Sequence, residues 1–209
     1  MNQKKNILFY GIGFLLSLVF IYIFVFFAYY NFYIGLLWAC YVGIFLMIIG
    51  IIFKKPNLIL SQIIILLGLD LFWAFDFFYR LIMGTSLFEI NNYFFGGDLL
   101  HKILSFQHIV TPILAISALA LIKIKKDYKA LWISFIEIIG FFILGFIIPA
   151  KYGINCLPIS KTCVSFVFPE FIPYPLIWFA IGFSLTTISY FIITSLPFLK
   201  KKEYRNPYK

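Results

Sequence analysis

Residues 58–83, LILSQIIILLGLDLFWAFDFFYRLIM, form a long apolar run that decides the fold of the chain. A helix needs about 20 apolar residues to cross the hydrocarbon core of a bilayer, and this run is long enough. Its hydrophobic residues are continuous and do not alternate with polar ones, which argues against a strand of a transmembrane β-barrel. The run therefore predicts a membrane-spanning α-helix that carries Asp70, Asp76 and Arg80.

The composition places the whole chain in the same class. Of its 209 residues, 63% are hydrophobic and only 12% are charged, whereas a soluble domain carries about 45–50% apolar and about 25% charged residues. The net charge of +9 raises the question of nucleic acid. The lysines, however, stand in short clusters between apolar runs, which is the distribution that encodes membrane topology. We expect the lipid bilayer to be a partner of the chain and nucleic acid not to be one.

Further apolar runs of about the length of a bilayer-spanning helix lie on both sides of residues 58–83. The sequence therefore predicts an all-α fold, with a single transmembrane domain over residues 1–209 that forms a bundle of six helices. The expected helices cover about residues 7–27, 34–53, 58–83, 103–122, 129–148 and 175–199.

The basic residues predict the orientation of the bundle. If the N-terminus is cytoplasmic, most of the 17 Lys and Arg residues lie on the cytoplasmic side, as the positive-inside rule requires. We therefore expect a multi-pass protein of the cell membrane with both termini in the cytoplasm. The larger loops, about residues 84–102 and 149–174, then face outward. Because function tends to collect in longer connections, we expect a site in the outer half of the bundle.

The cysteines indicate at most one disulfide and no metal site. Cys156 and Cys163 both fall in the second outer loop, where an oxidising environment allows them to pair; two unpaired thiols are the alternative. No histidine lies in this loop to complete a set of metal ligands, and Cys40 is interpreted as a small packing residue. The chain has no P-loop and no Gly-x-Gly-x-x-Gly motif, so the sequence predicts no cofactor.

Ionisable residues at membrane depth are costly and are usually functional. Asp76 and Arg80 stand four residues apart on one helix and are expected to pair in the outer third of the membrane. The helix at 103–122 runs back inward, which places His108 and Thr111 at a similar depth. The sequence thus predicts an outer polar cluster of these four residues.

Asp70 and Glu137 are expected deeper, near the middle of the membrane. A carboxylate isolated in lipid takes up a proton, so we expect these two acids to be protonated or to share a proton where they meet. Such a pair suits a proton-coupled step, and hydrogen bonding that only holds helices together is the alternative. The complete set of expected ligand-binding residues is Asp70, Asp76, Arg80, His108, Thr111 and Glu137.

Three stretches carry a resemblance to known proteins: DLFWAFDFFYRLIMG at 70–84, LSFQHIVTPIL at 104–114 and YGINC at 152–156. In these stretches the chain resembles a family of small prokaryotic polytopic integral membrane proteins that has no established activity. The resemblance implies no function, and it implies that the positions to test are Asp76, His108, Pro112 and Asn155.

Three functions remain open from the sequence. We favour small-molecule binding or transport, with a ligand that enters from outside between the third, fourth and fifth helices. Six helices with both termini inside look like the vitamin-binding subunits of energy-coupling transporters, by architecture alone. The first alternative is a membrane-embedded lipid hydrolase in which His108 is the catalytic base, Asp76 orients it, and Thr111 or Ser105 is the nucleophile. The second alternative is a structural or assembly protein in which the pair of Asp76 and Arg80 serves packing.

Overall fold

The computed structural model describes residues 2–88, 91–125, 127–148 and 174–201. In this part of the chain the regular secondary structure is helical apart from an isolated bridge between Ile124 and Lys200, so the expected all-α class is confirmed there. The elements in chain order are α1 (Gln3–Tyr29), η1 (Tyr33–Leu37), α2 (Ala39–Ile52), α3 (Pro56–Met83), α4 (Asn92–Gly96), α5 (Leu99–Ser105), α6 (Gln107–Ile122), α7 (Lys129–Ile147), α8 (Tyr174–Ser195) and η4 (Pro197–Leu199).

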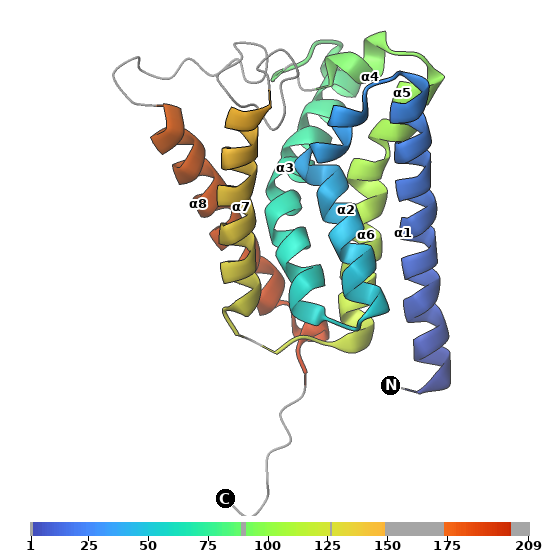
Figure 1. Cartoon of the computed structure of the whole chain (residues 1–209), viewed down its shortest axis with the longest axis vertical. Helices are drawn as coiled ribbons and strands as arrows, with labels where there is room; N and C mark the ends of the chain where they lie inside the picture. The colour runs from blue at the N-terminus through green and yellow to red at the C-terminus, as the bar shows by residue number, and fades with distance from the viewer. Residues whose placement is uncertain (1, 89–90, 126, 149–173, 202–209) are drawn as a thin grey trace, which may run out of the picture.

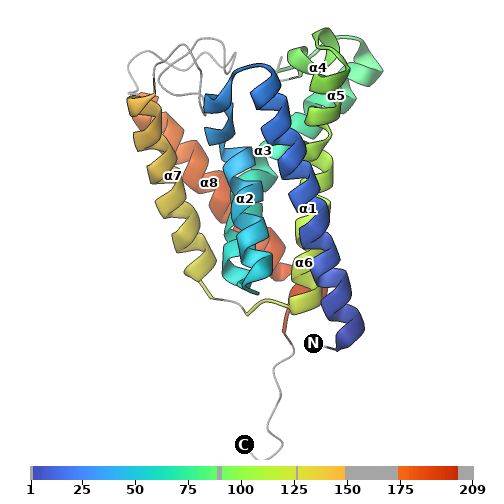
Figure 2. The same ribbon diagram turned by 45° about the vertical axis from the view of Figure 1, so that its right-hand side comes forward.

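The helix α3 is the centre of the bundle. It begins at Pro56, whose fixed φ suits the first helical position, and it ends before Gly84, which has a φ of 75°. It packs against α2, α6, α7 and α8, and 61% of its most apolar 18-residue window is buried, against 22–39% in the other long helices. Figures 1 and 2 both show α3 between α7 and α8 on one side and α1 and α6 on the other.

The helix α2 approaches α3 closely because glycines face it. A Cβ atom at Gly43 would lie 2.8 Å from Leu66 Cδ1, and one at Gly50 would lie 2.7 Å from Ile59 Cγ1. Small residues at such positions let the backbones of two membrane helices come together. The close contact between α2 and α3 therefore requires residues without a side chain at these two positions of α2.

Five helical segments are long and apolar enough to cross a membrane, by length and composition: α1, α3, the α5–α6 pair, α7 and α8. Their outer faces expose large hydrophobic side chains, for example Ile7, Ile82 and Ile147. An apolar surface that extends over several helices suits contact with lipid. To this extent the structure confirms the prediction of a multi-pass membrane protein.

The second expected span, residues 34–53, is not one continuous helix. It is interrupted at Trp38, which has an extended backbone (φ −66°, ψ 139°) and separates the five-residue η1 from the 14-residue α2. In η1, a Cβ atom at Gly35 would lie 2.2 Å from Phe27 Cε1, so the chain turns tightly against the end of α1 before α2 begins. At 1.5 Å per residue α2 alone is about 21 Å long, shorter than the hydrocarbon core of about 30 Å.

The first expected outer loop, residues 84–102, is partly helical. It contains α4 and most of α5, and α5 begins after Asp98, whose side chain accepts a hydrogen bond from His101 N (3.0 Å). The fourth span therefore begins at Leu99 and is broken at Phe106, where α5 ends and α6 follows. Figure 1 places α4 and α5 at the end of the bundle opposite to the N-terminus.

Of the second expected outer loop, residues 149–173 lie outside the described residues. The expected disulfide between Cys156 and Cys163, and the position Asn155 that the resemblance implies, fall in this segment.

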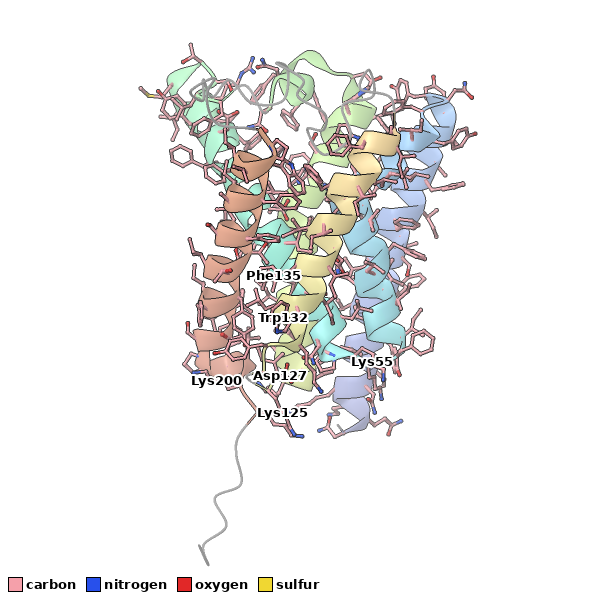
Figure 3. All side chains as sticks on the ribbon, turned by 60° about the vertical axis from the view of Figure 1, so that its left-hand side comes forward. Lys55, Lys125, Asp127, Trp132, Phe135 and Lys200 are labelled. Carbon is pink, nitrogen blue, oxygen red and sulfur yellow. The ribbon has the colours of Figure 1, made fainter. Side chains whose placement is uncertain are left out.

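The lysine clusters gather at one end of the bundle. Figure 3 shows Lys55, Lys125 and Lys200 near the same end, which is the end where the N-terminus lies in Figure 1. There the segment after α8 is hydrogen-bonded to the residues that follow α6. Ile124 N donates to Leu199 O (2.8 Å), and Lys201 N donates to Ile124 O (2.9 Å). Basic segments far apart in the sequence thus share one end of the fold.

Candidate functional site

A carboxylate of α3 and an imidazole of α6 meet inside the bundle. His108 Nδ1 lies 2.7 Å from Asp70 Oδ1, and only 16% of the His108 side chain and 6% of the Asp70 side chain are exposed. Asp70 lies near the midpoint of the 28-residue α3, so the pair lies deep in the bundle. In the described part of the chain the other ion pair, between Asp98 and His101, has more exposed side chains.

The neighbouring amide indicates the tautomer of His108. Gln107 Nε2 lies 3.0 Å from His108 Nε2, and an amide nitrogen only donates hydrogen bonds. In this orientation of the amide, His108 Nε2 accepts, so the proton of the neutral imidazole is on Nδ1 and is donated to Asp70. The three side chains form one hydrogen-bonded chain in which the carboxylate orients the imidazole.

The other walls of this site come from α2 and α3. The indole ring of Trp73 stacks on the His108 imidazole, with ring centroids 5.1 Å apart and an interplanar angle of 23°. A Trp face attracts a cation, so this position suits a protonated imidazole as well as a neutral one. The side chain of Cys40, on α2, lies close to the Gln107 side chain. Three helices therefore build the Asp70–His108 site.

Thr111 adds a buried hydroxyl on the same helix as His108. Its residue is 1% exposed, and Oγ1 has no hydrogen-bond partner among the described residues. Because residues three apart are neighbours on a helix surface, Thr111 and His108 lie on the same side of α6. A buried hydroxyl without a partner costs free energy, which makes it a candidate contact for a bound molecule.

Asp76 lies outside this site, and the expected pairing of Asp76 with Arg80 and with His108 is wrong. The Asp76 carboxylate instead accepts four hydrogen bonds from the chain that follows α3. The donors are Ser86 Oγ, Leu87 N and Phe88 N, each at 2.8 Å, and Asn91 Nδ2 at 3.1 Å. These hydrogen bonds satisfy the buried carboxylate and hold the start of the loop against α3.

Arg80 joins α3 to α4 at the same end of the bundle. Its Nη1 donates to Asn92 Oδ1 at 2.6 Å, and its guanidinium carbon lies 4.2 Å from the centroid of the Phe95 ring. Arg80 therefore faces α4 and does not take part in the Asp70–His108 site.

Glu137 has a third environment, and the expected meeting of Glu137 with Asp70 is also wrong. Gln62 Nε2 lies 2.7 Å and 2.8 Å from the two carboxyl oxygens of Glu137. Gln62 precedes Asp70 by about two helical turns, or about 12 Å along α3. Ser134 of α7 donates to Ser61 O at 3.0 Å, so Glu137 belongs to a polar contact between α3 and α7.

A further polar cluster joins the end of α1 to the start of α5. Tyr30 Oη donates to one Asp98 oxygen, and His101 Nδ1 lies 2.8 Å from the other. The hydrogen bonds from Tyr30 and from His101 hold the pKa of Asp98 below its usual range, and the bond to Asp98 raises the pKa of Tyr30 to about 12. The sequence gives no signal for this contact, because 68 residues separate Tyr30 from Asp98.

Sequence reasoning identifies Asp70, His108 and Thr111 and misses three of their neighbours. Gln107 adjoins His108, but consecutive residues of a helix project about 100° apart, so their spacing does not predict a contact between the two side chains. Trp73 is one aromatic residue among many, and a single Cys in an apolar helix is typical of packing. In the described part of the chain, no three His, Cys, Asp or Glu side chains are grouped as metal ligands.

Comparisons of the chain with protein-family models, curated proteins and solved structures give no match. The function must therefore be argued from the Asp70–His108 site and its surroundings.

Proposed function

We propose that the chain is a six-helix protein of the cell membrane that couples the movement of a small polar molecule to that of a proton. The observation that carries the proposal is the buried, hydrogen-bonded pair of Asp70 and His108 at the middle of the central helix. Ionisable groups at membrane depth are costly, and in transporters chains of Asp, Glu and His serve as proton relays.

The proposed topology has six crossings and both termini in the cytoplasm. The second crossing consists of η1 and α2 together: five residues of 3₁₀-helix add about 10 Å to the length of α2, which brings the segment to about the 30 Å of the hydrocarbon core. The lysines at the N-terminal end of the bundle support a cytoplasmic location of that end.

The pair can take up one proton without a net charge being left in the membrane. With Asp70 ionised and His108 neutral, the pair carries one negative charge. A proton that binds to His108 Nε2, after the Gln107 amide has turned to present its oxygen, gives an imidazolium that remains paired with Asp70 and stacked on Trp73. The proton-loaded pair is neutral overall, which is the less costly state in lipid.

The surroundings of the pair suit a small polar ligand. Thr111 Oγ1 has no partner among the described residues, and the side chains of Gln107 and Cys40 lie in the same region. Because these groups are enclosed, the helices must separate to admit a ligand. The interruption at Phe106, where α5 ends, and Pro112 inside the continuous α6 lie on either side of His108, and both are places where that span can bend.

Reconstituted vesicles test this proposal. Vesicles that contain a pH-sensitive dye and the protein are exposed to a mixture of amino acids, sugars, nucleosides and small carboxylic acids. We expect proton movement above that of empty vesicles for the wild type and for Glu137→Gln, which alters a buried acid outside the pair. We expect it to be lost in Asp70→Asn and His108→Gln. Wild-type movement no faster than that of empty vesicles, or full movement in these folded variants, would refute the proposal.

A second candidate, a membrane-embedded lipid hydrolase, rests on the Thr111 hydroxyl. In this reaction His108 would be the base, Thr111 the nucleophile, and Asp70, in place of Asp76, the residue that orients the imidazole. A lipid-soluble fluorophosphonate probe distinguishes the two functions. Labelling of the wild type that disappears in Thr111→Val and His108→Gln supports the hydrolase, and the absence of labelling in the folded wild type contradicts it.

A further inference from the structure

A hollow of about 570 Å³ lies at the N-terminal end of the bundle, away from the Asp70–His108 site. The start of α1, the turn between α2 and α3, the end of α6 and the segment after α8 form its walls. The lining residues are Asn2, Lys5, Lys54, Leu121, Ile122 and Lys201. Among the described residues its lining therefore includes three lysines and no acid. We propose that this hollow binds the phosphate headgroup of an anionic phospholipid.

Two lysines at this end stand where the backbone favours glycine. Lys54 follows α2 with a φ of 50°, and Lys123 follows α6 with a φ of 61° and a ψ of 147°. Glycine is the usual residue in a left-handed conformation after a helix, and the region that Lys123 occupies borders one that is almost exclusive to glycine. Topology requires positive charge at this end, but it does not require lysine at strained positions. Backbone strain of this kind clusters at ligand sites.

The lysines that line the hollow are held in place by the fold. Lys54 Nζ donates to Asn6 Oδ1 at 3.2 Å and lies 5.3 Å from the centroid of the Tyr10 ring. The main chain of Lys201 is fixed to the end of α6 by its hydrogen bond to Ile124 O (2.9 Å). Lys5 belongs to the first turn of α1. Three separate segments thus contribute lysines to the lining of one hollow.

A smaller hollow of about 290 Å³ adjoins the first and shares Lys54, Ile122 and Lys201 with it. It adds Lys123, Lys125 and one acid, Asp127. The Asp127 carboxylate accepts a hydrogen bond from Lys129 N at 3.0 Å at the start of α7. Positive charge therefore exceeds negative charge across both hollows.

The chemistry and the place of the site favour a lipid over a soluble phosphate. The hollow lies at the end of apolar helices, at the level where the headgroups of one leaflet meet a membrane protein. Leu121 and Ile122 continue its wall onto α6, so an anionic headgroup at the lysines leaves its acyl chains beside apolar side chains. Basic pockets at the ends of membrane helices bind anionic headgroups in this way.

Native mass spectrometry of the full chain in detergent, titrated with phosphatidylglycerol or phosphatidylcholine, tests the site. The test variant is Lys5→Gln/Lys54→Asn/Lys201→Gln, in which Asn tolerates the left-handed conformation at residue 54. The matched control, Lys55→Gln/Lys200→Gln, removes two lysines from the same end that do not line the hollow. We expect the wild type to prefer phosphatidylglycerol. Each lysine lost from the hollow should weaken that binding about fivefold, and the control should stay within about twofold of the wild type.

Three results would overturn the proposal: no preference of the wild type for phosphatidylglycerol, an equal loss in the control, or binding by the folded triple variant as tight as by the wild type. Displacement of the lipid by equimolar glycerol phosphate would also overturn it, because the site would then be one for a soluble phosphate. If the triple variant does not fold, Lys5→Gln and Lys201→Gln are measured singly, each with the same fivefold expectation, and an unchanged affinity in both refutes the site.

Discussion

Breaking the Asp70–His108 pair should destabilise the fold by an amount that an ordinary hydrogen bond cannot explain. His108→Ala leaves the Asp70 carboxylate, of which 6% is exposed, without its partner, and removing one member of a buried pair costs about 3–5 kcal/mol. Asp70→Ala leaves a buried N–H group without an acceptor, which costs about 1–3 kcal/mol. The double variant leaves neither group unpaired, so its destabilisation should fall short of the sum of the two by about 2–3 kcal/mol.

This coupling energy distinguishes a buried pair from simple contact between helices. Hydrogen bonds between membrane helices average about 0.6 kcal/mol, well below the expected coupling. The assay is reversible unfolding in mixed micelles of sodium dodecyl sulfate and a mild detergent, followed by tryptophan fluorescence. Ser117→Ala is the matched control on α6, because Ser117 is exposed and bonds only its own helix at Ile113 O. It should change stability by less than about 0.5 kcal/mol. A coupling energy within about 0.5 kcal/mol of zero would refute the reasoning.

Three further predictions concern the rest of the bundle. Gly50→Val puts a Cβ 2.7 Å from an α3 side chain and should lower the free energy of unfolding by about 1–3 kcal/mol, whereas Gly140→Val, with open space around it, should have little effect. Asp76→Asn should speed hydrogen exchange at the backbone amides of Leu87 and Phe88, which donate hydrogen bonds to the Asp76 carboxylate, by at least about tenfold. Because folding lowers the pKa of Asp98, the ionised carboxylate stabilises the folded state. This stabilisation is fully present above the ordinary pKa of about 3.9, and it is lost as the pH falls through the pKa of the folded state. The melting temperatures of the wild type and Asp98→Asn should therefore converge in acid. In that variant the pKa of Tyr30, about 12 in the wild type, should fall toward about 10, as ultraviolet absorbance measured against Tyr30→Phe would show.

Each of these predictions has a result that contradicts it. Equal unfolding free energies for the Gly50 and Gly140 variants would mean that α2 does not approach α3 closely. Unchanged exchange in Asp76→Asn would mean that the loop is held elsewhere. A constant difference in melting temperature between the wild type and Asp98→Asn across the acid range would mean that this carboxylate is not linked to stability.

The spans could be predicted largely from local chemistry. Continuous apolar runs give the helices, Pro56 can start α3 because it needs no amide donor there, and Gly84 can end it at a positive φ. The break at Trp38 could not be predicted, because it depends on the packing of η1 against Phe27, a contact between segments that are both apolar. Hydrophobicity marks a span but does not show whether its helix is continuous.

The site could be predicted only in part, because helical phase gives the face of a residue but not its partner on another helix. The sequence assigns His108 to the outer third on the assumption that its span begins at about residue 103. The span begins four residues earlier, at Leu99, which places His108 about 6 Å deeper than expected. His108 contacts Asp70 (2.7 Å) and not Asp76, which lies about 9 Å farther along α3.

The partners of Asp76 and Glu137 illustrate the same limit. Asp76 has a cation four residues away, but backbone amides and two side chains of the following loop take its oxygens. Glu137 has Asp70 at a similar expected depth, yet it meets Gln62. A loop that folds back, or a helix shifted by two turns, changes which polar groups meet, and neither is visible in a single sequence.

Nitrogen-15 NMR of the protein labelled at histidine tests the Asp70–His108 pair most directly, because the chain has only two histidines and His101→Gln assigns their signals. At neutral pH we expect His108 to show a protonated, hydrogen-bonded Nδ1 and an unprotonated Nε2. The Nδ1 signal should shift in Asp70→Asn and stay in place in Asp76→Asn and Glu137→Gln. A His108 signal that responds to Asp76→Asn and not to Asp70→Asn would contradict the pairing on which the proposed function rests.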